Sequence, residues 1–218
     1  MKLLLGIPSP RNIPPVTKHW PDLPCDRLII KYYKEWDAYQ TLRNFFIEHS
    51  EYTHLGIASD DLVVKPDDVE LLVGDIQRLD YPIMSGVCNV NEGSPNVLTI
   101  IAIENAPTIE KRKFYWILRK QADGIMKVGH VGFPLTIIRR DIVELINFES
   151  HSQLLGGDPN EWGNIDITFC TRCRENNIPM YADTDIYMSH LRSHPGEDIP
   201  GVKEPHLIFM KHEIRNSV

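Results

Sequence analysis

The sequence predicts an α/β fold with a mixed, mostly parallel sheet flanked by helices. Short apolar segments rich in β-branched residues alternate with longer segments whose apolar residues recur at helical spacing. Strands that alternate with helices in this way pair in parallel, because each helix returns the chain to the same end of the sheet. The chain has 218 residues, of which 42% are hydrophobic, so it is long enough to bury a core as one domain.

The first half of the chain is expected to supply four strands and two helices. A helix is expected over residues 37–49, where Leu42 and Phe46 lie on one face. Pro66 marks the start of the second helix, because its fixed φ suits the first helical position. Several prolines between residues 8 and 26 indicate a loop. The strands are expected at residues 2–7, 27–33, 53–58 and 81–88.

In the second half, closely spaced strands replace the regular alternation. No helix fits between the strands expected at residues 97–104 and 114–120, so the sheet is expected to gain antiparallel members. We expect one domain over residues 1–192 and a C-terminal tail, residues 193–218, that packs on it through the apolar cluster at 207–210 or covers a partner. The remaining elements are a loop, strand and short helix over 129–146, an amphipathic helix over 165–177 and two short extended pieces over 180–191.

Composition narrows the class of partner. The formal net charge of −7 argues against a nucleic acid, which favours a basic face. No apolar run is long enough to cross a bilayer, and the one at residues 3–7 is too short for a signal peptide, so a cytoplasmic protein is expected. Four cysteines are too few for a disulfide framework, which also fits a reducing compartment. Cys170 and Cys173 are expected to pack within a helix, with a redox or metal role as the alternative.

Two adjacent carboxylates, Asp60 and Asp61, directly follow the third expected strand. In open α/β sheets, ligands bind beyond the carboxyl ends of the strands. Adjacent carboxylates repel each other, and partial burial raises the cost. Mg²⁺ or Mn²⁺ would offset that repulsion, and these cations prefer carboxylate and phosphate oxygens. The pair therefore predicts a site for a divalent cation and a diphosphate, with a solvated acidic turn as the alternative.

The stretch IASDDLVVKPDDVELL resembles a segment of GT-A-fold glycosyltransferases of the family 2-like group. In that group a strand ends in an acidic DxD-type motif, and a Pro-Asp opens a helix shortly afterwards. Ser59 stands where the motif has its first aspartate, so its ribose or metal contact would pass to Asp60. The resemblance spans about residues 2–191, and three further segments match in order: LLLGIPSPRN, GHVGFPLTIIRRDIVELI and EWGNIDITFCTRCRENNIPMYADTDIYMSH.

The resemblance implies an enzyme that uses Mn²⁺ or Mg²⁺ to move a sugar from a nucleotide-diphosphate donor to a hydroxyl group. The acceptor would be a carbohydrate, a lipid-linked molecule or a protein. Two alternatives stay open: a sugar nucleotidyltransferase, and a non-catalytic member that binds a sugar or nucleotide. The first is disfavoured because the segment GIPSPRNIPP lacks the glycine-rich phosphate loop of such enzymes.

The resemblance also assigns roles to individual residues. Asp61 and His190 would hold the metal. Asp166 would be the base of an inverting reaction, with a helix N-cap as the alternative. The nucleotide would contact Pro8, Ser9, Lys31 and Asp60, and the loop residues facing donor sugar and acceptor would be His130, Gly132 and Trp162.

Overall fold

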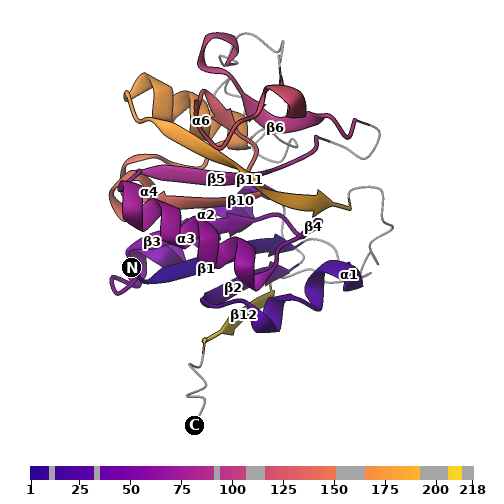
Figure 1. Ribbon diagram of the computed structural model, residues 1–218. Helices are drawn as coiled ribbons and strands as arrows, with labels where there is room; N and C mark the ends of the chain where they lie inside the picture. The colour runs from indigo at the N-terminus through magenta and orange to yellow at the C-terminus, as the bar shows by residue number, and fades with distance from the viewer. Residues whose placement is uncertain are drawn as a thin grey trace.

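A computed structural model describes residues 1–9, 13–31, 35–90, 94–106, 116–150, 165–191 and 206–212. Within these ranges the main sheet has nine strands in the order β12-β2-β1-β3-β10-β5-β11-β4, and β8 pairs with β11 (Figure 1). Its strands are β1 (Leu3–Ser9), β2 (Asp26–Lys31), β3 (His54–Ala58), β4 (Leu62–Val63), β5 (Ile83–Cys88), β8 (Ile125–Val128), β10 (Leu135–Arg139), β11 (Met180–His190) and β12 (His206–Met210).

Strands β1, β2, β3, β5 and β11 run in one direction, and β10 lies antiparallel between β3 and β5. The carboxyl ends of the five parallel strands therefore meet at one edge of the sheet, together with the start of β10. We call this edge, formed by the residues at and just after the ends of those five strands, the carboxyl edge. The expected α/β architecture is confirmed.

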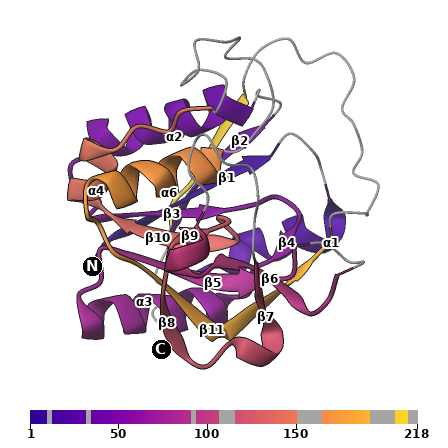
Figure 2. The ribbon, with the colours of Figure 1, turned by 90° about the horizontal axis from the view of Figure 1, so that it is seen from above.

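Helices cover both faces of the sheet and bury a separate apolar core on each (Figure 2). One face carries α2 (Glu35–Glu48), α4 (Arg140–Leu145) and α6 (Ile165–Glu175), and the other carries α1 (Pro14–Thr17) and α3 (Pro66–Leu79). Pro66 begins α3 as expected, and the Asp68 carboxylate accepts the backbone N–H of Lys65 at 2.8 Å. Three short 3₁₀ turns complete the described elements: η1 (Trp20–Asp22), η2 (Ile103–Asn105) and η3 (Arg119–Gln121).

A second, three-stranded sheet contains the segments that were expected to extend the main one. Its order is β7 (Trp116–Leu118), β6 (Val97–Ile101) and β9 (His130–Val131), all antiparallel. The expectation of added antiparallel members was wrong for β6 and β7, because β6 takes β9 as its partner. β9 then leads the chain directly into β10, so this small sheet stands beside the carboxyl edge.

Two other segments differ from the sequence-based expectation. The proline-rich segment, expected to be a loop, contains α1 and η1. The segment expected to form two extended pieces is one strand, β11, whose pairing with β5 shifts register between Ala182 and Tyr187. Apolar residues of the tail form β12, which adds an antiparallel edge strand to β2. In the parts of the chain described, no helix is long and apolar enough to span a membrane.

Candidate functional site

Polar side chains gather where the parallel strands end. Asp60 and Asp61 follow β3 and are buried, with exposed fractions of 3% and 6%. Asn89 follows β5, and His190 is the last residue of β11. Two neighbouring buried carboxylates need positive partners, because burial penalises uncompensated charge. The carboxyl edge therefore concentrates acidic groups that favour a cationic neighbour.

Asp61 is held between the ends of β3 and β11. Its Oδ2 atom lies 3.3 Å from Nε2 of His190, while Oδ1 accepts a 2.7 Å hydrogen bond from the Ser59 hydroxyl. The Asp61 carbonyl accepts the backbone N–H of Leu191 at 2.7 Å. Ser59, which precedes the two aspartates, thus orients the Asp61 carboxylate.

The orientation of His190 is fixed from its other side. Nδ1 lies 2.8 Å from the carbonyl oxygen of Asn89, which can only accept, so Nδ1 carries a proton. Burial opposes the charged form of His190, but hydrogen bonds to Asp61 and Cys88, the Asp61 charge and the Asn89 carbonyl together raise its pKa to about 10. The ring is therefore an imidazolium ion paired with Asp61 at neutral pH.

Asp61 and His190 supply an oxygen and a nitrogen ligand that suit Mn²⁺. No group of three or more His, Cys, Asp and Glu side chains arranged to hold a metal ion occurs among the residues that the structure describes. The two side chains fit a cation that takes its remaining ligands from substrate phosphates and water, a common arrangement for Mg²⁺ and Mn²⁺. Such a cation would have to displace the Nε2 proton of His190.

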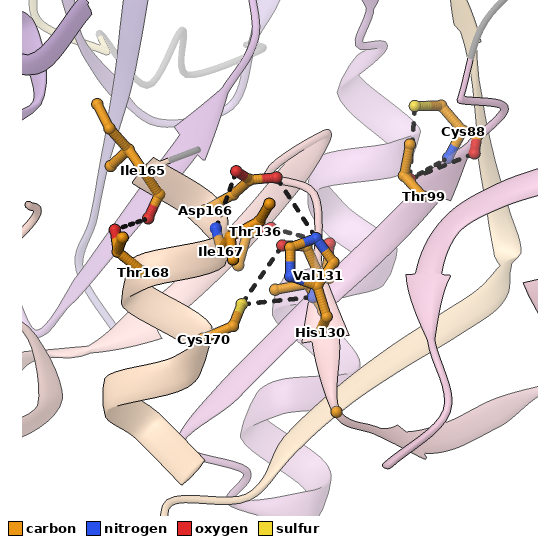
Figure 3. Close-up of polar contacts among 12 residues, drawn as sticks. Cys88, Thr99, His130, Val131, Thr136, Ile165, Asp166, Ile167, Thr168 and Cys170 are labelled. Carbon is orange, nitrogen blue, oxygen red and sulfur yellow. Dashed lines mark hydrogen bonds and ion pairs between the residues drawn. The ribbon is translucent and has the colours of Figure 1, made fainter. Parts of the chain in front are cut away.

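A second acid–imidazole pair lies at the start of α6 (Figure 3). Asp166, in the first turn, places Oδ2 3.4 Å from Nε2 of His130, and its Oδ1 accepts the backbone N–H of Ile167 at 2.9 Å. The Asp166 side chain is 28% exposed, whereas that of His130 is fully buried. A carboxylate at this position is favoured by the helix dipole. The ring of His130 contacts Asp166 and the protein interior instead of solvent.

The two pairs are connected through β6. Thr99 donates its hydroxyl to the carbonyl oxygen of Cys88 at 3.2 Å, and Cys88 contacts His190. The Thr99 carbonyl accepts the backbone N–H of Gly132 at 3.0 Å, two residues after His130. A Cβ on Gly132 would lie 3.1 Å from Cβ of Thr99, so glycine permits this close approach. Figure 3 shows the Cys88–Thr99 contacts and the Asp166–His130 pair in one view.

Three of the other residues expected in the site lie at the ends of β1 and β2. Pro8 and Ser9 end β1 and are buried, and Lys31 ends β2 beside Ser9 with a partly exposed side chain. Trp162 lies outside the described residues. Sequence reasoning missed Asn89, although it directly follows an expected strand and the same rule that selected Asp60 would have selected it.

A cavity of about 360 Å³ lies at the amino-terminal ends of the parallel strands, opposite the carboxyl edge and far from both acid–imidazole pairs. Its lining includes Leu3 and Asp26, which begin β1 and β2, together with Val69 of α3. The acid–imidazole pairs stand near the carboxyl ends of strands, where ligands bind in open α/β sheets. We therefore place the candidate site at the carboxyl edge and not at this cavity.

No family model matches the sequence, and neither does any curated protein. Among solved structures, A197 from STIV is 16% identical, with a TM-score of 0.56 over 84% of this chain and 82% of that chain. CMP:2-keto-3-deoxy-manno-octonic acid synthetase complexed with CTP is 13% identical, with a TM-score of 0.46 over 92% and 94% of the two chains. The inositol-1-phosphate CTP transferase from T. maritima is 8% identical, with a TM-score of 0.47 over 87% and 89%. The likeness to A197 concerns the fold alone, and the two lower scores are too weak to support more.

Proposed function

We propose that the chain is a metal-dependent transferase that acts on nucleotide-activated sugars at the carboxyl edge. The observation that carries this proposal is the contact between Asp61, which is buried, and His190, which is largely buried. These two ligand-type side chains stand at or just after the ends of β11 and β3. When bound, a divalent cation would stabilise the negative charge of a departing diphosphate. Ser59 and Asn89 would hold the two protein ligands in place.

Glycosyl transfer is the first candidate reaction, and the Asp166–His130 pair favours it. Asp166 would take the proton from an acceptor hydroxyl while that oxygen attacks the anomeric carbon of the donor. The bond from this carbon to the diphosphate oxygen would break, and the nucleoside diphosphate would leave with the bonding electrons. Attack from the side opposite the leaving group would invert the configuration of the sugar.

Sugar nucleotidyl transfer is the second candidate reaction. A sugar phosphate is already ionised, so its attack on a nucleoside triphosphate needs no base, and the Asp61–His190 side of the site would suffice. Two of the compared structures have names of this reaction class, at TM-scores too low to support the choice. In this reaction Asp166 would only shape the site.

A donor screen separates the two candidates. The protein is incubated with Mn²⁺ and UDP-, GDP- or dTDP-sugars, and release of nucleoside diphosphate is measured; in parallel, sugar 1-phosphates and nucleoside triphosphates are tested for pyrophosphate release. Glycosyl transfer predicts activity only in the first set, and nucleotidyl transfer only in the second. Metal-dependent binding of UDP or GDP without turnover in either set would indicate a non-catalytic binding protein and contradict the proposal.

Asp61→Asn tests the metal assignment. Without this carboxylate we expect Mn²⁺-dependent turnover to fall about 100-fold or more, because the cation loses a ligand and the diphosphate loses its counter-charge. Asp67→Asn is the matched control, since it removes the same charge from an exposed position early in α3. Equal activity of the two variants would refute the role of Asp61.

A further inference from the structure

His130 is an unusual histidine because its ring is fully buried and its nitrogens are incompletely paired. Nε2 stands at ion-pair distance from Asp166, 3.4 Å, yet neither ring nitrogen makes a hydrogen bond of normal geometry with the described residues. Burying an imidazole without hydrogen bonds costs free energy. A compensating interaction offsets that cost, and the carboxylate of Asp166 is the charged group that the ring faces.

The surroundings leave the ring little freedom. The rings of His130 and of Trp116 in β7 form a T-shaped contact with centroids 5.8 Å apart. Cys170 of α6 contacts both the His130 ring and the backbone of Val131. Arg174 of α6 donates to the carbonyl oxygen of Gly129, which precedes His130. The charged and titratable groups facing the ring in the described parts of the chain are Asp166 and Cys170, both from α6.

Asp166 divides its two oxygens between local structure and His130. Oδ1 accepts the Ile167 N–H within the first turn of α6, and Oδ2 faces Nε2 of His130. The helix N–H and the imidazole nitrogen therefore approach the carboxylate from its two separate oxygens. Fixing both oxygens also limits rotation of a side chain that is partly exposed and would otherwise sample several rotamers.

We propose that His130 is a positioning residue, whose buried ring holds the Asp166 carboxylate in one orientation at the start of α6. This inference rests on the proposed function, in which Asp166 accepts a proton from the acceptor hydroxyl. His130 itself touches no substrate in this assignment, because its side chain is fully buried. From the sequence, His130 was expected to face the donor sugar and the acceptor. In this proposal His130 acts through Asp166 instead.

The pairing of His130 with Asp166 can be tested without an activity measurement. The ring nitrogens of His130 are followed by NMR as pH is varied. Burial opposes the charged form, but Cys170 and Asp166 together raise the pKa of His130 to about 10, so the ring should stay charged at neutral pH. Asp166→Asn should lower the titration midpoint by at least about one pH unit, because the ring loses its counter-charge. Glu175→Gln, which removes a carboxylate from the far end of α6, should leave the midpoint unchanged.

The kinetic test uses His130→Gln, Asp166→Asn and the double variant, each checked for folding by its thermal transition. If His130 acts through Asp166, His130→Gln should lower kcat about 100-fold with little change in KM for the donor. The double variant should then be no slower than Asp166→Asn alone.

The positioning role would be overturned if His130 titrated with a midpoint near the ordinary value of about 6.5 and Asp166→Asn left that midpoint unchanged. A double variant in which the loss of kcat equals the product of the two single-variant losses would overturn the positioning role as well. If His130→Gln does not fold, the NMR comparison still decides, since it leaves His130 in place. An inactive wild-type protein would refute the proposed function while the titration still reports on the pair.

Discussion

The protonation state of His190 links the stability of the carboxyl edge to pH. The Asn89 carbonyl fixes one proton on Nδ1, and the proton on Nε2 depends on Asp61. Because the folded-state pKa of about 10 lies above the ordinary value for histidine, protonated His190 stabilises the fold. That contribution is fully present below about pH 6.5 and is lost as pH rises through the folded-state pKa.

We therefore expect the stability difference between wild type and His190→Gln to depend on pH. Measured as Tm in metal-free buffer, the difference should be largest near about pH 6 and should shrink steadily toward about pH 10. A difference that stays constant over this range would show that His190 contributes by packing alone. His49→Gln, at a half-buried position just after α2, serves as a histidine control far from Asp61.

The positions of some residues of the candidate site could be predicted from the sequence, and those of others could not. Asp60, Asp61 and His190 could, because each stands at or just after the end of an expected strand, and parallel strands place such residues together. The burial of His130 could not, because it depends on β9 pairing with β6 and on α6 packing against β9. Those contacts join residues far apart in the sequence, and no local pattern encodes them.

At the scale of elements, β1 packs so tightly against α2 that Gly6 has no room for a side chain. A Cβ at Gly6 would lie 2.1 Å from a methyl carbon of the fully buried Leu42. Gly6→Ala should therefore lower the free energy of unfolding by about 1–3 kcal/mol, because the core must shift to accept it. Urea denaturation measures this change.

Gly74 in α3 gives the opposite expectation. A Cβ there would meet no heavy atom within 4 Å, so alanine adds no clash and restricts the unfolded chain. Gly74→Ala should raise the free energy of unfolding by about 0.5–1 kcal/mol. If both alanine variants shifted stability in the same direction, the packing difference described for β1 and α3 would be wrong.

Strong local patterns made most elements predictable to within a few residues. The helix expected at 37–49 is α2, and the strand expected at 53–58 is β3. The partners of β6, β7 and β12 were not predictable, because a strand's sequence specifies its faces and not which neighbour it joins. The short β4 and β9 have two residues each, too few to show any period.

At the scale of the whole molecule, Asp26 joins three segments that are distant in the sequence. It lies at the amino-terminal ends of the parallel strands, opposite the candidate site. Its Oδ2 accepts the Tyr52 hydroxyl at 2.8 Å, and Oδ1 accepts the backbone N–H of His212 at 2.7 Å. Asp26 begins β2, Tyr52 precedes β3, and His212 follows β12. This buried carboxylate thus fastens the end of β12 to the body of the sheet.

Asp26→Ala should lower the free energy of unfolding by about 1–3 kcal/mol, because a buried hydroxyl and a backbone N–H lose their acceptor. Amide exchange of residues 206–210 should quicken more than that of β1, since β12 loses its anchor. Asp22→Ala, at an exposed position in η1, is the control. Unchanged exchange in β12 would contradict the anchoring role of Asp26.

The pairing of β12 with β2 also has a consequence for synthesis on the ribosome. About 175 residues separate the two strands along the chain, so β2 emerges long before the segment that covers its outer side. Throughout that interval the nascent protein presents unpaired backbone groups along β2. Because an unpaired strand edge can pair with another chain, we expect a chaperone present over this interval to reduce aggregation of the newly made protein.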